Sequence, residues 1–492
     1  MSRLSILDLS FLVAERRNTP MHVGGLNLFQ LPKGANRDEF LRELLGSLRS
    51  SEPLQRPFCD RLQTGVMGSL AGAHWVHDDE LDLEYHVRHS ALPSPGRYRE
   101  LFALVSRLHG TLLDRSRPLW EMHLIEGVNR REFALYSKYH HAVIDGVRGV
   151  HLVRSMFSTS PEEIRDHSPL SVTAQRRYES LLSDHGMRIK APPEINRGVV
   201  ERFKAQLDLA GDIYSRTRKQ LSAVSQAGIR ETLMPWSMTP RSALNAPIDG
   251  SRRFVAQSFD VQRFLAVKKH FGCTLNDAVL AACSGALVRY LEHHAELPEK
   301  PLRALVPISL RKPGDLESAN AVGGIIANLA TDIRDPAQRL AKISESMRHG
   351  KAIYDDMSAA EAAALFALMQ SQNFILSALQ LTRRLPAIST TISNVPGPRE
   401  QMFWNGAPMT GYYPASIVLD GFALNITLIS YYKTLDFGIT ACRRSVPQAQ
   451  RLIEYLEEAL QELEVVAGLR GGDSHTRRRT PARPKTRRKQ AA

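Results

Sequence analysis

The chain has 492 residues, more than one ordinary hydrophobic core accommodates, so we expect two domains or two large lobes. Hydrophobic residues make up 43% of it and charged residues 23%, which is typical of a soluble globular protein. The four cysteines are scattered without a C-x-x-C pair, which predicts reduced thiols and argues against a metal framework. We find neither a secretory signal nor a run of about 20 apolar residues that would predict a spanning helix.

The net charge of +13 is unevenly distributed. Residues 470–492 contain nine Lys or Arg against one Asp, so this tail carries +8 and the rest of the chain only +5. The tail has no bulky apolar residue, and we predict that residues 469–492 are disordered. It could attract anionic lipid head groups or be a solubilising extension. It lacks aromatic residues to stack bases, so no nucleic-acid partner is expected.

The first third of the chain predicts a strand-rich lobe. Two glycines, Gly24 and Gly25, precede a strand at 26–31, and we interpret the nearby His22 as structural. Residues 81–89 are expected to be irregular or extended, and 93–96 form a turn. Leucines at helical spacing predict an amphipathic helix at 100–113. Trp120, in a P-L-W string, is expected to pack near the strand that follows.

The most informative string is H-H-x-x-x-D-G, which comprises His140, His141, Asp145 and Gly146. Alternating apolar residues predict a strand at 132–138, and valines at helical spacing predict a helix from 147 to 157. The string therefore lies where a strand ends and turns into a helix. Adjacent residues on an extended backbone point to opposite faces, so one imidazole can face a cavity while the other packs. Histidine is also the side chain most easily used as a general base near neutral pH.

Paired histidines also have two plainer interpretations. They are often ordinary surface or core residues, as we expect for His293 and His294. A metal site would need further ligands, and no Cys or second carboxylate is spaced to supply them, so no metal is predicted.

The middle of the chain predicts a connection between two lobes. Residues 158–197 turn polar and A-P-P at 191–193 ends any helix, while 199–225 resume helical character. We therefore divide the chain into an N-terminal lobe (1–157), a linker and helical connection (158–241), a C-terminal lobe (242–468) and the tail. A strand at 254–259 opens the second lobe.

The second lobe contains several further signals. Thr274 and Asp277 form a capping pattern at the start of a helix whose apolar stripe reaches Tyr290. Residues 305–310 predict a strand that ends at Arg311, and the S-N-V-P-G-P string at 393–398 predicts a sharply turned loop. Residues 422–430 and 435–442 predict a hairpin. An Ala- and Leu-rich segment at 362–382 is interpreted as a buried helix in preference to a membrane-touching one.

Together these strings resemble a known family. H-H-x-x-x-D-G is similar to the signature of the chloramphenicol-acetyltransferase-like acyltransferases. The accompanying strings P-M-H-V-G-G, P-L-W, N-D at Asn276 and S-N-V-P-G-P, in this order from residue 4 to about 463, resemble the bacterial wax ester synthase/acyl-CoA:diacylglycerol acyltransferase family. The resemblance implies an α/β (α+β) fold with two chloramphenicol-acetyltransferase-like lobes, mixed sheets and a tunnel between them.

The resemblance also implies roles for particular residues. His141 would be the general base, His140 its packing partner, Asp145 structural, and Gly146 the residue that permits tight entry into the helix. Asn276 would lie near the site and could donate a hydrogen bond to an oxyanion or a substrate carbonyl, while Asp277 caps its helix. Arg311, with Arg148 as a rival, is the expected ion-pair partner of Asp145.

The expected reaction is transfer of a long-chain acyl group from acyl-CoA, as co-substrate, to diacylglycerol or a long-chain alcohol. No cofactor is needed, because a thioester is already activated. We expect a cytoplasmic enzyme, peripherally associated with the inner face of the plasma membrane or with lipid inclusions. Two alternatives stay open: transfer to a polyketide or peptidyl hydroxyl, and a non-catalytic lipid-binding protein. The residues leave open the acceptor, the acyl chain length and the oligomeric state.

Overall fold

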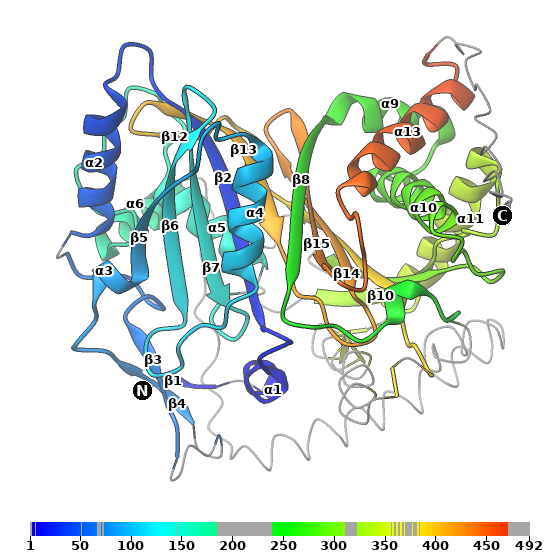
Figure 1. Cartoon of the computed structure of the whole chain (residues 1–492), viewed down its shortest axis with the longest axis horizontal. Helices are drawn as coiled ribbons and strands as arrows, with labels where there is room; N and C mark the ends of the chain where they lie inside the picture. The colour runs from blue at the N-terminus through cyan, green and yellow to red at the C-terminus, as the bar shows by residue number, and fades with distance from the viewer. Residues whose placement is uncertain are drawn as a thin grey trace, which may run out of the picture.

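Two six-stranded sheets, each with its own helices, form the body of the protein (Figure 1). The computed structural model describes residues 2–4, 6–50, 52–65, 70, 73–144, 146–184, 239–309, 322–355 and 384–470, and also 357–358, 361–362, 365–366, 369, 376 and 381–382. Strands and amphipathic helices are mixed in both halves, so the predicted two-lobed α/β architecture is confirmed.

The N-terminal sheet has the strand order β12-β13-β2-β7-β6-β5. Its strands are β2 (His22–Gln30), β5 (Val87–Ala91), β6 (Trp120–Val128), β7 (Glu132–His140), β12 (Phe403–Trp404) and β13 (Ala407–Ala415). All neighbours are antiparallel except β5 and β6. One face packs against α4 (Tyr98–His109) and β8 (Arg252–Asp260), and the other against α2 (Arg37–Leu48). Both faces are covered, so β7 is buried along its whole length after Glu132.

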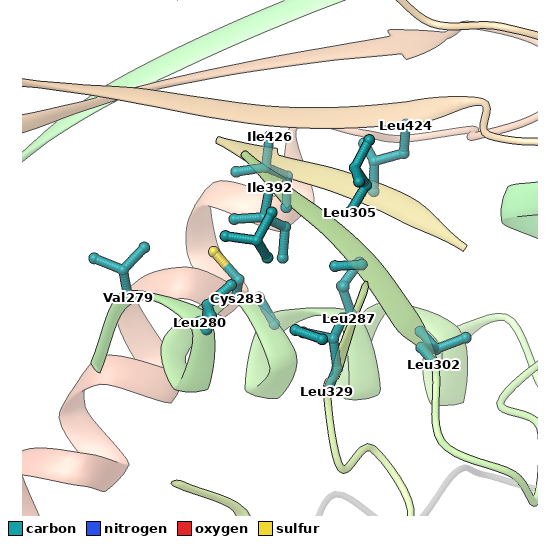
Figure 2. Close-up of a cluster of buried hydrophobic side chains, with 14 of the residues drawn as sticks. Val279, Leu280, Cys283, Leu287, Leu302, Leu305, Leu329, Ile392, Leu424 and Ile426 are labelled. Atoms are coloured by element: carbon teal, nitrogen blue, oxygen red, sulfur yellow. The ribbon is translucent and has the colours of Figure 1, made fainter. Parts of the chain in front are cut away.

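The C-terminal sheet is mixed and has the order β10-β9-β11-β14-β15-β8. Its strands are β8 (Arg252–Asp260), β9 (Arg303–Ser309), β10 (Val322–Asn328), β11 (Thr390–Pro396), β14 (Leu424–Tyr431) and β15 (Thr434–Cys442). The helices of this half are α9 (Val261–Phe271), α10 (Leu275–His293), α11 (Pro336–Ala352) and α13 (Arg451–Val466). Figure 2 shows Val279, Cys283 and Leu287 of α10 beneath strand residues such as Ile392 and Ile426, in one continuous core.

One segment of the C-terminal half crosses into the N-terminal sheet. β13 pairs antiparallel with β2, so that Tyr412 lies opposite Asn27, and β12 extends the same sheet. β13 also contacts β14 and β15, so it joins the two sheets. The predicted division, which placed all of 242–468 in the C-terminal lobe, does not include this crossover.

The remaining elements lie outside the two large sheets. They are α1 (Ile6–Ala14), α3 (Leu83–His86), α5 (Gly146–Met156), α6 (Val172–Asp184), the short helix η3 (Ala243–Asn245), and the small sheet of β1 (Ser2–Arg3), β3 (Asp60–Gln63) and β4 (His74–His77). Figure 1 shows α1 at the lower edge of the molecule, below the junction of the two halves.

Most predicted elements are found, with two corrections. The strand at 132–138 is β7 and continues to His140, the helix at 100–113 is α4, and the hairpin is β14–β15. The prediction of a loop at 393–398 was wrong for Ser393 to Pro396, which end strand β11 and pair with β14. The segment at 81–89 is not simply irregular or extended, because it forms the single helical turn α3 and then enters β5.

Two predicted segments are described only in part. The connection at 158–241 begins as packed structure, since Leu170 is fully buried and α6 contacts α5, but 185–238 and the predicted helix at 199–225 lie outside the described residues. Of the predicted helix at 362–382, the described Ala362, Leu365 and Met369 are buried. Among the described residues, no single helix has the length and apolar composition to cross a membrane; α9 and α10 pass that test only as a pair, bent by 104°.

Candidate active site

The paired histidines lie at the end of β7, and their side chains are in different surroundings. His140 is the last residue of the strand and is completely buried, whereas His141 begins the turn and is half-buried. Helix α5 begins at Gly146. The arrangement of strand, turn and helix is therefore the one expected from the sequence, with one imidazole packed and one partly accessible. Asp145 and Arg311 lie outside the described residues.

The hydrogen bonds of His140 fix its tautomer. Its Nδ1 accepts a hydrogen bond from the backbone N–H of Ala142 at 3.1 Å. An imidazole nitrogen that accepts carries no proton, so in the neutral ring the proton is on Nε2. That atom lies 3.5 Å from Oε1 of Glu15 and makes no well-aligned hydrogen bond among the described residues. His140 thus holds the turn in place and points its N–H towards a carboxylate.

Glu15 follows helix α1, and its side chain is only 3% exposed. Its Oε1 accepts from the backbone N–H of Met21 at 3.2 Å, and its Oε2 accepts from Nε and Nη2 of Arg115 at 3.1 and 3.0 Å. Burial raises the pKa of Glu15, but His140, the Met21 amide and Arg115 together lower it below its ordinary value. The carboxylate is therefore ionised at neutral pH.

The contacts of His141 include a backbone hydrogen bond and an aromatic contact. Its N–H donates to the carbonyl of Met21 at 2.8 Å. Its ring stacks on Phe11 of α1, with centroids 4.2 Å apart and an angle of 20° between the planes. Phe11 therefore covers one face of the imidazole and limits the orientation of its ring plane.

A layer of buried polar residues lies beneath the turn. Lys138, on the same face of β7 as His140, is completely buried and lies 3.1 Å from Oε2 of Glu121. Across the sheet, His22 pairs with His140 in register and its Nε2 donates to the carbonyl of His109 at 2.5 Å. Burial lowers the pKa of His22 well below its ordinary value and that of His109 to about 3, so both stay neutral. This agrees with the structural interpretation of His22.

Trp120 lies where the sequence predicted it, beside the end of β7. It pairs with Tyr139 across the β6–β7 ladder, and its indole N–H donates to the carbonyl of Phe58 at 2.9 Å. It is completely buried and stacks on His86. Trp120 therefore stabilises the end of β7, the strand that leads to the paired histidines.

The N-D pair lies in the first turn of α10. Thr274 and Asp277 form the predicted capping box, since the Asp277 N–H donates to Thr274 Oγ1 at 3.2 Å and the Thr274 N–H donates to Asp277 Oδ2 at 2.9 Å. A cavity of about 480 Å³ beside Asp277 is lined by residues of α9, α10 and α11 and the segments that flank them, including Arg348. Neither His140 nor His141 lines this cavity. The role of Asn276 beside His141 therefore stays a prediction.

One group of side chains in the described residues has the donor atoms of a metal site. Ligand atoms of Cys59, Asp60 and His77, on and beside the β3–β4 pair, lie within 4.8 Å of one another. Burial raises the pKa of both Cys59 and Asp60, which disfavours the charged forms that bind metals. Arg56 Nε also lies 3.5 Å from Oδ2 of Asp60 and supplies a positive charge there. The trio is remote in sequence from the paired histidines.

Sequence reasoning missed Phe11, Glu15 and Arg115. The four-residue spacing of Phe11 and Glu15 places them on one helical face, which was the available signal. Their contact with residues 140–141 spans more than a hundred residues, and nothing in the local pattern indicates it.

Comparison with known proteins identifies relatives along almost the whole chain. The family model described as wax ester synthase/diacylglycerol acyltransferase catalytic domain matches residues 4–279, and the model of the corresponding C-terminal domain matches 318–464. O-acyltransferase WSD of Acinetobacter baylyi is 40% identical over 466 residues, covering 95% of this chain and 98% of the relative. A protein of Mycobacterium tuberculosis assigned as a diacylglycerol O-acyltransferase is 42% identical over 468 residues, covering 95% of this chain and 100% of the relative.

Solved structures are also similar to this chain along 95% of its length. The wax ester synthase/diacylglycerol acyltransferase from Marinobacter aquaeolei superposes with a TM-score of 0.75 at 38% identity, covering 95% of this chain and 100% of that one. The starter condensation domain of rhizomide synthetase superposes with a TM-score of 0.53 at 12% identity, covering 95% of this chain and 95% of that one. The second likeness concerns the fold alone.

Proposed function

Because the chain belongs to the wax ester synthase/diacylglycerol acyltransferase family, we propose that it transfers a long-chain acyl group from acyl-CoA to diacylglycerol, to a long-chain alcohol, or to both. Family membership makes it an acyl-CoA-dependent O-acyltransferase. The chain length of the acyl group and the identity of the acceptor are the parts of this function that we propose.

The observation that carries the proposed mechanism is the contrast between the two histidines. His140 is completely buried and its tautomer is fixed by the Ala142 N–H, whereas the side chain of His141 is only half-buried. His141 is therefore the base that can reach a substrate. It takes the proton from the acceptor hydroxyl as the alcohol oxygen attacks the thioester carbonyl. When the tetrahedral intermediate collapses, the C–S bond breaks and the imidazolium returns the proton to the departing CoA thiolate.

The other predicted site residues keep supporting roles in this proposal. Asp145 and Gly146 shape the turn between His141 and α5, with Arg311 or Arg148 as the ion-pair partner of Asp145. Asn276 is proposed as a donor to the oxyanion. No cofactor is required in this mechanism, because the thioester supplies an activated carbonyl and the base supplies the proton transfer.

We propose a cytoplasmic location at the inner face of the plasma membrane or at lipid inclusions. Val465, Val466 and Leu469 are exposed at the end of α13, immediately before the basic segment that starts at Arg470. Apolar side chains next to a run of positive charge fit a surface of anionic lipid.

The test is CoA release from palmitoyl-CoA, measured separately with dioleoylglycerol and with hexadecanol. The wild type should release CoA with at least one acceptor, and His141→Ala should be about a hundredfold slower or worse, the usual contribution of a general base. His293→Ala, in the other histidine pair, should leave the rate unchanged. The preferred acceptor names the activity.

Two alternatives have their own outcomes in this experiment. A protein that binds palmitoyl-CoA but releases no CoA with either acceptor would be a non-catalytic lipid-binding protein. A protein that is silent with both lipids but acylates a hydroxylated thioester of a polyketide or peptide would belong to the other acyltransferase branch.

A further inference from the structure

Helix α1 brings two side chains to the paired histidines. Phe11 and Glu15 are four residues apart and lie on one face, and the Glu15 N–H still donates to the Phe11 carbonyl. Phe11 reaches the ring of His141, and Glu15 reaches the ring of His140. One helical turn therefore contacts both imidazoles of the string.

Glu15 closes a ring of contacts around the turn. Its Oε1 accepts from the Met21 N–H, the Met21 carbonyl accepts from the His141 N–H, and His140 Nε2 faces the same carboxylate oxygen. The end of α1, the start of β2 and the end of β7 are thereby tied together. Arg115 anchors the arrangement from outside, because its Nη2 donates both to Glu15 and, at 2.6 Å, to the carbonyl of Leu12.

Phe11 also connects the turn with the other half of the molecule. It belongs to the core of the C-terminal half, together with Leu244 and Ile248, whereas Leu12 belongs to the core under the N-terminal sheet. α1 is therefore packed into both cores at their junction. The plane of the His141 ring is set by a side chain that the second lobe holds in place.

We infer that Phe11 and Glu15 are positioning residues for acyl transfer: Phe11 holds the imidazole of His141 in its reactive plane, and Glu15 holds the turn through His140 and Met21. This inference rests on the proposed function, in which His141 is the base. Neither residue takes part in the proton transfer. Misplacing a reacting group by about 1 Å can cost up to about a hundredfold in rate, so loss of either contact should slow the chemical step.

The first test compares side chains at position 11. Phe11→Leu keeps an apolar side chain but removes the ring, and Phe11→Tyr keeps the ring. We expect kcat to fall about tenfold or more in Phe11→Leu, with the KM for palmitoyl-CoA within about twofold of wild type, and to recover most of its value in Phe11→Tyr. Phe259→Leu, at another buried phenylalanine, is the matched control and should keep the wild-type kcat per folded molecule.

The second test uses Glu15→Gln, which retains an oxygen for the Met21 N–H but loses the charge that faces His140 and Arg115. We expect a fall in kcat of about tenfold or more. Glu464→Gln is the control, since Glu464 of α13 is also a buried carboxylate paired with an arginine, Arg263, but belongs to the other half of the molecule. It should lose stability and keep its kcat per folded molecule.

A double mutant separates positioning from general loss of structure. If Phe11 acts through His141, adding Phe11→Leu to His141→Ala should slow the residual reaction no further, although each change alone is costly. If His141→Ala is inactive while Phe11→Leu and Glu15→Gln match their controls, the inference fails and the proposed function stands. If His141→Ala retains wild-type activity, the proposed function itself fails.

Discussion

Three basic side chains surround the buried carboxylate of Glu121. Lys138, His123 and Arg88 lie 3.1, 3.5 and 3.6 Å from its oxygens. Burial raises the pKa of Glu121, but these three groups together lower it to about 2. Burial also lowers the pKa of Lys138, and Glu121 opposes that effect. The pair is therefore ionised in the folded protein, and each partner needs the other.

The pH dependence of this residue can be tested directly. A carboxyl whose pKa falls from 4.5 to about 2 on folding contributes about 3 kcal/mol above pH 4.5, and this contribution is lost as the pH falls from 4.5 to 2. Glu121→Gln should lower the thermal midpoint by several degrees at pH 7 and by much less at pH 3. Glu43→Gln, at an exposed position in α2, is the control. An equal decrease at both pH values would contradict the argument.

The local sequence pattern predicted the turn that carries the paired histidines, but it did not predict the side chains of Phe11 and Glu15 that contact this turn. The alternation before His140 and the helical spacing after Gly146 are contained in about twenty-five residues, so they can be recognised in sequence. The partners of the turn, Phe11 and Glu15, come from a separate helix. Their approach depends on how α1 packs between the two cores, which no short pattern encodes.

The elements themselves were predicted best where one face is apolar. β7, α4 and the β14–β15 hairpin follow their periodicities. The S-N-V-P-G-P string predicts a loop because Pro and Gly favour turns. In the structure Pro396 ends β11, and pairing with β14 decides the conformation of the residues before it.

Strands β15 and β13, which belong to different sheets, approach closely at Gly438 of β15. A Cβ built there would collide with the backbone carbonyl of Pro414 in β13. Because the obstacle is backbone, Gly438→Ala should cost about 3 kcal/mol or more through displacement of the two strands.

The matched control is Gly46→Ala in α2, where an added Cβ has no atom within 4 Å. This change should be neutral or stabilise the helix by about 0.5–1 kcal/mol. Thermal unfolding of the two variants checks both expectations. Similar midpoints for Gly438→Ala and Gly46→Ala would mean that the two sheets can separate at this point without cost.

In the whole molecule, a buried carboxyl lies where the two sheets meet. Asp436 of β15 is fully buried and its Oδ2 accepts from the backbone N–H of Tyr412 in β13 at 2.7 Å. Burial raises its pKa to about 6, although its hydrogen bonds oppose the shift. The folded protein therefore holds a proton here that the unfolded chain loses above about pH 4, and stability falls as the pH rises from 4 to 6.

Asp436→Asn removes this dependence while keeping an acceptor for the Tyr412 N–H. The variant should be more stable than wild type at pH 7.5, by up to about 3 kcal/mol, and should lose that advantage at pH 4. Thermal midpoints at the two pH values decide the question. A variant that is less stable at both would show that the ionised carboxylate has partners that compensate its burial.

The two-lobed fold and its mixed sheets could be expected from the family resemblance and the order of the elements. The exchange of β12 and β13 between the halves could not, because their sequence fits either sheet. Which sheet they join depends on the free edge of β2, nearly four hundred residues earlier in the chain.

Because of this crossover, the N-terminal sheet can be completed only late in the synthesis of the chain. The ribosome completes β2 by residue 30 but releases β13 only after residue 407, and at roughly 5–20 residues per second the interval is on the order of tens of seconds. Throughout that time the nascent N-terminal sheet has an unpaired edge at β2, the kind of edge on which other chains can pair. The N-terminal sheet is therefore completed only after β13 has been synthesised, and until then the edge of β2 is open to pairing with other chains.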